Sequence, residues 1–112
     1  MNKNQEMSII GSIINDNTLL SDFNVTPNLF VSNEHKQLVE AMWALRRRDK
    51  TIDFFTLGDE AKHVIERVGM PYLVDAQSMA NDEQFNEYLD SLKESWRNRE
   101  KVRILNTALQ KD

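Results

Sequence analysis

Apolar residues recur at intervals of three and four along most of this chain, and residues that form turns are scarce. The 112 residues include three Gly and two Pro, far fewer than a fold of many short strands needs. Strict alternation of apolar and polar residues is nowhere sustained, whereas spacing near 3.6 residues is typical of helices that bury one face. The sequence therefore predicts an all-α fold, with a compact head of about five or six short helices followed by a long C-terminal helix.

The composition excludes several classes of protein. Without cysteine there is no disulfide, zinc–thiolate site or thiol chemistry. The formal net charge of −4 is opposite in sign to that of most free-standing DNA-binding domains, whose affinity depends on neutralising phosphates. The N-terminal residues do not resemble a signal peptide, and no apolar run approaches the roughly 20 residues that cross a bilayer. We expect a cytoplasmic protein without membrane contact.

The first predicted helix covers residues 5–15 and has Gly11 at its middle. A glycine inside a helix costs roughly 1 kcal/mol relative to alanine, which indicates that another helix approaches closely at this point. A second, short helix is expected around Leu19 and Leu20. The dipeptide Thr26-Pro27 then predicts a single helical turn, because threonine is a good N-cap and proline is favoured at the first helical position.

The clearest predicted helix covers about residues 33–48, with Ser32 or Asn33 as its N-cap. It ends in three consecutive arginines, Arg46 to Arg48. Cations at this end of a helix complement the partial negative charge of unpaired carbonyl groups. We therefore interpret the arginines as a solvated helix end, and the alternative is that they contact nucleic-acid phosphates.

Asp53 is predicted to cap a further helix over about residues 54–67. The apolar members of this helix are expected to be Phe55, Leu57, Ala61, Val64 and Ile65. Gly69 is placed to end it, and Pro71 is placed to begin the next helix. The predicted core of the head draws on all of these segments: Ile10, Ile13, Ile14, Phe30, Leu38, Met42, Leu45, Ile52, Leu57, Val64 and Tyr72.

A long terminal helix is expected to begin after a cap at Asn81 or Asp82 and to run nearly to residue 110, so the head spans residues 1–80 and the helix residues 81–112. Its apolar stripe steps by four, three and four, which is typical of a helix that pairs with another helix: Phe85, Leu89, Leu92 and Trp96. After a polar interruption the stripe is expected to resume at Val102, Leu105 and Leu109. A helix of about 28 residues is roughly 40 Å long. We expect its far half, Trp96 included, to lie beyond the head and to need a partner.

The sequence contains no arrangement typical of a catalytic site. The three glycines are isolated, so there is no phosphate-binding loop. His35 and His63 lie in different predicted helices with no further His or Cys at metal-ligand spacing, and we interpret them as structural or surface residues. We expect no catalytic, cofactor-binding or metal-binding residue in this chain, which predicts contact with other macromolecules rather than enzymatic activity.

Five short patterns occur in order along the chain. They are Glu6–Ile14 (EMSIIGSII); Phe30 with His35, Leu38, Val39, Met42 and Leu45; Ile52-Asp53 with Thr56-Leu57; Gly69 with Tyr72-Leu73; and Asn86 with Tyr88 and Arg97 or Arg99. Together, and in this order, they resemble the N-terminal domain of the bacterial replicative DNA helicase, the DnaB family. Val31 stands where the family has an aromatic residue and Val68 where it has a glycine. These departures indicate a divergent member, such as that of a phage, prophage or plasmid.

The resemblance implies a function and an incomplete architecture. In that family the head is followed by a helical hairpin, a linker and a motor domain that hydrolyses ATP. Residues 83–112 look like only the first arm of the hairpin; the second arm and the motor, with its ATP and Mg, are absent. The implied role is a non-catalytic collar domain of a hexameric helicase, which mediates subunit assembly and docks primase, a helicase loader or a phage regulator. The fragment itself is expected to dimerise and not to bind DNA tightly.

The residues expected to contact partners all lie on the terminal helix: Tyr88, Leu92, Trp96, Arg99, Val102, Leu105 and Leu109. Tyr88 matches a tyrosine of the family's hairpin arm, a region that by resemblance takes part in primase docking; the alternative is that Tyr88 packs on the head. Two other functions stay open. One is a helical DNA-binding domain that uses residues 46–50 and 97–103 as phosphate contacts, and the other is a stand-alone regulator derived from a helicase head.

Overall fold

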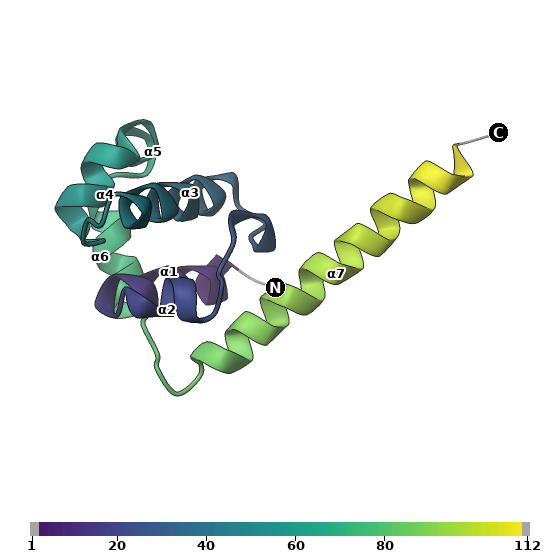
Figure 1. The fold of residues 1–112 in the computed structure, drawn as a ribbon, viewed down its shortest axis with the longest axis horizontal. Coiled ribbons are helices and arrows are strands. Elements are labelled where there is room, and N and C mark those ends of the chain that lie inside the picture. Colours follow the sequence, from purple (N-terminus) through teal and green to yellow (C-terminus); the bar gives the residue numbers. More distant parts are fainter. Residues whose placement is uncertain (1–2, 111–112) are drawn as a thin grey trace.

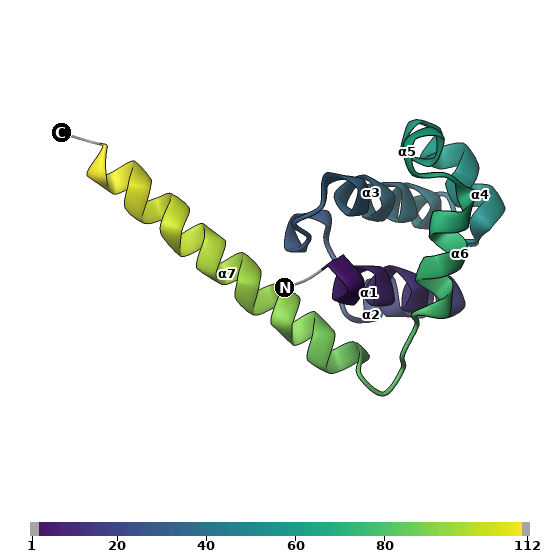
Figure 2. The same cartoon turned by 180° about the vertical axis from the view of Figure 1, so that it is seen from behind.

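The computed structural model describes residues 3–110 and contains no strand within them. The outermost residues of the expected ranges 1–80 and 81–112 therefore lie outside the described residues. The elements are α1 (Lys3–Asn15), α2 (Thr18–Asp22), the 3-10 turn η1 (Pro27–Leu29), α3 (Asn33–Arg47), α4 (Phe54–Glu60), α5 (Lys62–Val68), α6 (Met70–Ser78) and α7 (Phe85–Leu109). Helices α1–α6 form the head, and α7 runs along one side of it and then projects far beyond it (Figures 1 and 2). The predicted all-α fold is confirmed.

The centre of the head is α1, which packs against α2, α3, α6 and α7. Its isoleucines at positions 9, 10, 13 and 14 form one broad apolar face, and Ser8, Gly11 and Ser12 on the other side of the helix are buried as well. A helix that is buried on both sides is stable only when other elements surround it. The predicted core is confirmed: ten of its eleven side chains are buried, and the eleventh, Tyr72, is half-buried against them.

The expected close approach at Gly11 is found where α1 crosses α6. A Cβ atom at this position would lie 1.8 Å from the carbonyl oxygen of Ala76, which is far inside van der Waals contact. Because this oxygen belongs to the backbone of α6, it cannot move away by a rotamer change as a side-chain atom can. Only glycine fits between these two helices as they are packed.

Side chains at the helix ends explain where several elements begin. The hydroxyl of Ser32 accepts from the backbone N–H of His35 at 3.4 Å and caps α3. Asp53 accepts from the N–H groups of Phe55 and Thr56, both at 2.9 Å, while Thr56 Oγ1 accepts from the Asp53 N–H at 2.9 Å. This reciprocal pair is a capping box, and both predicted caps are confirmed.

Asn17 joins the end of α1 to the loop before α4. Its amide nitrogen donates to the carbonyl oxygens of Ile13, at 2.8 Å, and Ile52, at 3.1 Å, and its oxygen accepts from the Ile52 N–H at 2.8 Å. These bonds satisfy backbone groups that no helix or strand would otherwise pair. They also hold the side chain of Ile52 in the core, where it is buried.

The arginine cluster ends α3, as expected. Arg46 and Arg47 lie in its last turn, and Arg48 follows as the C-cap. Arg48 is half exposed and forms a forked ion pair with Glu60, at 2.8 and 3.1 Å. The hydrogen bond from Arg48 is the main cause that lowers the pKa of Glu60.

Across residues 3–110, no helix is both long enough and apolar enough to pass through a membrane.

The predicted helix over residues 54–67 is wrong in two respects. The segment is two helices, α4 and α5, which meet at Ala61, where φ is −110° and ψ is 41°. Phe55 is 86% exposed instead of buried. Its position is two residues before the buried Leu57, which places the two side chains roughly 200° apart around α4. Phe54 packs against the core in its place.

The predicted start of the terminal helix is also wrong. The helix begins at Phe85 after Gln84, which makes no side-chain capping bond. Asn81 instead accepts from the Gln84 N–H at 3.2 Å and so caps the turn that precedes the helix. The N–H of Asn81 donates to Ser12 Oγ at 3.3 Å, which anchors this turn to α1.

Replacement of Gly11 by alanine should destabilise the head strongly. The new methyl group would force α1 and α6 apart, and overpacking of this kind costs about 1 to 3 kcal/mol or more. Gly58→Ala in α4 is the matched control, because its Cβ would meet only the flexible end of Met70 at 3.0 Å and gains helix propensity. Urea unfolding should give a much lower midpoint for Gly11→Ala and a change within about 1 kcal/mol for Gly58→Ala. Equal effects would contradict the tight crossing.

Candidate docking surface on the terminal helix

The first half of α7 is held on the head by an apolar face. Phe85, Leu89 and Leu92 are buried, and Trp96 packs partly buried against the same core. The ring of Phe85 meets Phe23 edge to face, with centroids 5.2 Å apart. These contacts join α7 to α1, to the C-cap residue of α2 and to the η1 turn.

Two of the residues predicted to bind partners therefore pack against the head instead. Leu92 has no exposed surface, and the expectation that Trp96 lies beyond the head is wrong. The head reaches further along α7 than its length suggested because the η1 turn extends it in that direction. Trp96 lines a surface hollow together with Pro27 and Asn28 of this turn.

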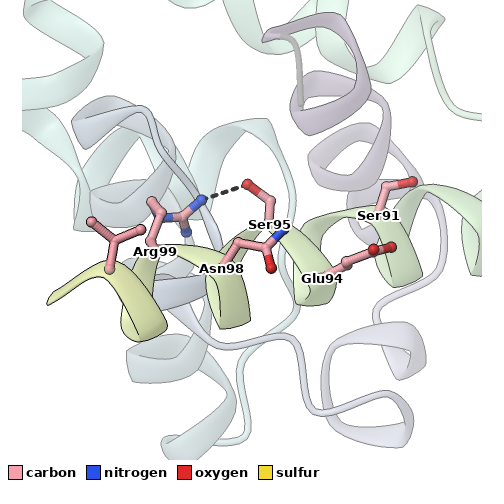
Figure 3. Close-up of a pocket in the computed structure, with 6 residues that line it drawn as sticks. Ser91, Glu94, Ser95, Asn98 and Arg99 are labelled. Carbon is pink, nitrogen blue, oxygen red and sulfur yellow. Dashed lines mark hydrogen bonds between the residues drawn. The ribbon is translucent and has the colours of Figure 1, made fainter. Parts of the chain in front are cut away.

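Arg99 bonds α7 to the head near the middle of the helix. Its guanidinium donates to the carbonyl oxygens of Asn28 and Leu29, at 3.3 and 3.2 Å. It also donates to Ser95 Oγ at 2.8 Å, as Figure 3 shows. The carbonyl groups at the end of a helical turn carry partial negative charge, so the cation suits them. In this structure Arg99, predicted as a partner residue, clamps α7 to the head.

Beyond Arg99 the apolar side chains of α7 are open to solvent. Val102, Leu105 and Leu109 are 57%, 61% and 76% exposed. They do not continue the face that packs on the head, contrary to expectation. Val102 follows Trp96 by six residues, or roughly 600° of rotation, which leaves it about 120° away from Trp96 around the helix. The role of these three residues in binding a partner stays a prediction.

A shallow groove runs along α7 on the side where these exposed residues lie (Figure 3). It is lined by Ser91, Glu94, Ser95, Asn98, Arg99 and Val102. Sequence reasoning overlooked Ser91, Ser95 and Asn98, which are polar or small and belong to no apolar stripe. Counting backwards from Val102 in steps of four, three and four would have found them.

Tyr88 is half-buried at the edge of the face that packs on the head. It lines a small hollow with Asn4 and Ser8 of α1 and with Met79. This position favours the alternative in which Tyr88 packs on the head, while its role in docking stays a prediction.

The head contains one cluster of side chains that resembles a reaction centre. Nδ1 of His35 lies 2.7 Å from a carboxylate oxygen of Glu6, and Nε2 lies 2.6 Å from the hydroxyl of Tyr72. The Glu6 carboxylate also accepts from the backbone N–H groups of Val31, at 2.9 Å, and Ser32, at 3.4 Å. The cluster joins α1, α3 and α6.

The electrostatics of this cluster favour an ionised Glu6. Burial alone would raise the pKa of Glu6, but the hydrogen bonds from His35 and from the Val31 N–H outweigh it, and the net pKa lies below the usual 4.5. Burial raises the pKa of Tyr72, and the negative charges of Glu34 and Glu6 raise it further. Both effects keep Tyr72 protonated as a hydrogen-bond donor.

The cluster is closed to substrates. Glu6 is 2% exposed and His35 is fully buried, and both ring nitrogens already have partners. The interpretation of His35 as a structural residue is confirmed, and His63 is exposed. Among the residues that the structure describes, no three His, Cys, Asp or Glu side chains are placed to hold a metal ion. The surface of α7 is therefore the better candidate for function.

Comparisons with known proteins show which family this chain matches. The family model of the DnaB-like helicase N-terminal domain matches residues 1–94. A solved structure of a DnaB-like replicative helicase, described with its interactions with primase, matches with a TM-score of 0.87 and 20% identity. That match covers 97% of this chain but only 27% of the helicase chain, so the chain spans about a quarter of the length of that relative.

A second solved structure is similar over most of its own length. The crystal structure of the N-terminal domain of DnaB helicase from Mycobacterium tuberculosis matches with a TM-score of 0.85 and 21% identity, over 98% of this chain and 83% of that one. At these identities the two structures establish the fold. No curated protein sequence matches the chain significantly.

Replacement of Glu6 by glutamine should lower the free energy of unfolding by about 1 to 3 kcal/mol at pH 7, because hydrogen bonds to a buried charge are lost. The folded-state pKa of Glu6 is lowered, so its contribution is complete above the unfolded-state pKa and is lost as the pH falls through the folded-state value. Urea titrations from pH 7 to pH 3 should therefore show the two proteins converging below about pH 4.5. A difference that stays constant over this range would contradict the assignment.

Two leucines on α7 test where the head ends. Leu92→Ala removes a fully buried side chain and should cost about 2 to 5 kcal/mol. Leu105→Ala removes one that is 61% exposed and should change the stability of the head by less than about 1 kcal/mol. Thermal unfolding at low protein concentration measures both without a contribution from self-association. Similar costs at the two positions would mean that the head covers the far half of α7 as well.

Proposed function

Because the chain belongs to the family of DnaB-like helicase N-terminal domains, we propose that it is a non-catalytic assembly and docking domain of a replicative DNA helicase. On this proposal ATP and Mg are bound by a motor domain of the helicase and not by residues of this chain. The domain acts by contact: its head is a stable platform, and α7 presents a surface for other proteins.

The observation that carries the proposal is that α7 is covered along only half of its length. From Phe85 to Arg99 the helix packs on the head, whereas Val102, Leu105 and Leu109 face solvent. Leaving three large apolar side chains exposed along one stripe is unfavourable unless a partner covers them. The same residues are on the arm that the family resemblance assigns to assembly.

Primase is the first candidate for a docked partner, since the helicase that matches at a TM-score of 0.87 is described with its interactions with primase. A helicase loader or a phage regulator that binds the same surface is the alternative within this proposal. A stand-alone regulator derived from a helicase head would use the same surface. It would differ in that its gene encodes no ATPase motor domain.

The distribution of charge disfavours DNA as the main partner. Residues 1–96 contain nine Lys and Arg against sixteen Asp and Glu, a formal charge of −7. Residues 97–110 contain four cations and one acid, but Arg99 is bonded to the head and Arg103 is paired with Glu100 at 2.8 Å. We expect DNA binding that is weak and falls steeply with salt, because little beyond phosphate contact supports it.

Binding to the primase of the same genome tests the proposal by calorimetry. The triple variant Val102→Ser, Leu105→Ser, Leu109→Ser should bind at least about tenfold more weakly, the equivalent of about 1.4 kcal/mol. Phe55→Ser is the matched control, because it also removes an exposed apolar side chain but from the head, and its affinity should be unchanged. Equal affinity of the triple variant and the original chain would overturn the proposal, and so would DNA binding tighter than primase binding at physiological salt.

A further inference from the structure

We propose that an exposed apolar surface on α4 and α6 binds a short basic amphipathic helix of another protein, independently of α7. The surface, here named the α4–α6 patch, consists of Phe55 and Gly58 of α4 and Met70 and Val74 of α6. It lies on the side of the head away from the free half of α7 (Figures 1 and 2). The inference goes beyond the proposed function, because it assigns a second surface that does not include α7.

The large side chains of the α4–α6 patch are open to solvent. Phe55 is 86% exposed, Val74 48% and Met70 37%. The core does not use Phe55, since the neighbouring Phe54 packs against it instead. Apolar residues that are exposed singly are normal on a protein surface, whereas a contiguous group of them marks an interaction site.

The residues of α4 and α6 form one surface rather than two. A Cβ atom at Gly58 would lie 3.0 Å from the terminal methyl carbon of Met70, so the methionine reaches across to the glycine. Phe55 precedes Gly58 by three residues, and Val74 follows Met70 by four. Residues at these intervals share one face of a helix. The patch is therefore continuous across the contact between the two helices.

An exposed acid borders the patch on α4. Asp59 follows Phe55 by four residues and lies roughly 40° from it around the helix, on the side away from Gly58. Asp59 is exposed and takes part in no ion pair within residues 3–110. Lys62 is three residues further along, beyond the end of α4, and does not pair with it. This edge of the patch therefore carries an unpaired negative charge.

A second acid borders the patch on α6. Asp75 directly follows Val74 and lies roughly 100° from it around the helix, on the side away from Met70. It is exposed as well, and no ion pair in the described part of the chain includes it. The apolar patch thus has a free carboxylate along each of its two outer edges.

Charge and size together select the kind of partner. Like charges repel, so the two carboxylates disfavour nucleic acid, an anionic membrane and a second copy of the same patch. Three partly exposed side chains offer on the order of 300 Å² of apolar surface, far less than the roughly 800 Å² that each partner buries in a stable dimer. A short segment that is apolar in its middle and positively charged at its sides matches both properties.

A helix satisfies both edges better than an extended segment does. On an amphipathic helix the polar residues flank the apolar stripe on both sides, so cations reach Asp59 and Asp75 at the same time. Lys and Arg also lay their apolar stems along the surface while their charged ends reach outward. An extended segment turns successive side chains to opposite faces, which would direct half of them away from the head. The binding of an amphipathic helix to an apolar surface is a common mode of recognition.

A designed peptide provides the probe. It is a fluorescein-labelled, Ala-based helix of about 15 residues, with Leu at i, i+3, i+4 and i+7 and Lys on both sides of this stripe. Fluorescence anisotropy should show that the complete chain binds it with a Kd below about 1 mM. The same peptide with Glu in place of Lys should bind at least about tenfold more weakly, because its charges repel the carboxylates. Equal affinities, or no binding of the Lys peptide at about 1 mM, would overturn the inference.

Single substitutions locate the peptide on the head. Phe55→Ser should raise the Kd of the Lys peptide at least about fivefold, and Asp59→Asn about threefold. The matched controls are Val31→Ser, which removes an apolar side chain that is 55% exposed, and Asp90→Asn, which removes an exposed acid of α7. Both should keep the Kd within about twofold, and circular dichroism should show unchanged folding because all four side chains lie outside the core. Controls as weak as Phe55→Ser would show unspecific attraction to an acidic chain and overturn the inference.

Failure of this inference can be told apart from failure of the proposed function. The variant with serine at positions 102, 105 and 109 should bind the Lys peptide with unchanged affinity, and Phe55→Ser should bind primase with unchanged affinity. Loss of the peptide in the triple variant would place it on α7, and loss of primase in Phe55→Ser would place one partner on both surfaces. Self-association that Phe55→Ser abolishes would identify a second copy as the occupant. Each of these three results overturns the inference, whereas the docking role of α7 depends on the primase measurement alone.

Discussion

The close crossing of α1 and α6 is the constraint on which the rest of the structure depends. Gly11 lets the two backbones approach until no Cβ atom would fit, and α1 and α6 are in extensive contact around this crossing. This crossing fixes where α6 ends and where the following turn begins. The turn is bonded to Ser12, the neighbour of Gly11, through the N–H of Asn81. A contact inside the first helix therefore sets the point from which the last helix departs.

The buried polar cluster of Glu6, His35 and Tyr72 fixes the orientation of the helices relative to one another. Apolar packing alone tolerates sliding and repacking, whereas the Glu6 carboxylate must receive the donors that surround it. His35 satisfies it from α3, the Val31 N–H from the preceding loop, and Tyr72 completes the chain of bonds from α6. Losing a donor to the Glu6 carboxylate leaves a buried charge with fewer hydrogen bonds, which costs more than losing a single apolar contact. The cluster thus selects one arrangement of three helices.

The sequence predicted those parts of the fold that local chemistry determines. Caps such as Ser32 and Asp53, and the role of Gly11, follow from short-range rules, and the structure confirms them. The predictions were wrong where the burial of a residue depends on which helices and turns pack against each other. Phe55 is exposed because it lies roughly 200° around α4 from the buried Leu57, and Phe54 packs on the core instead. Leu92 and Trp96 were assigned to partner contact because periodicity alone does not reveal that the η1 turn extends the head along α7.

The exposed apolar stripe of α7, formed by Val102, Leu105 and Leu109, does not continue the face that packs on the head. If it continued the face that packs on the head, a partner could bind only by displacing the head. It lies instead about a third of a turn away, so it is open to a partner while α7 stays packed on its own head. Arg99 lies between the two surfaces, bonded to Leu29 on one side and, on the other, to Ser95 of the groove that Val102 also lines. Arg99 adds to the apolar contacts of Phe85, Leu89 and Leu92 that hold α7 on the head, and it fixes the helix just before the exposed stripe begins.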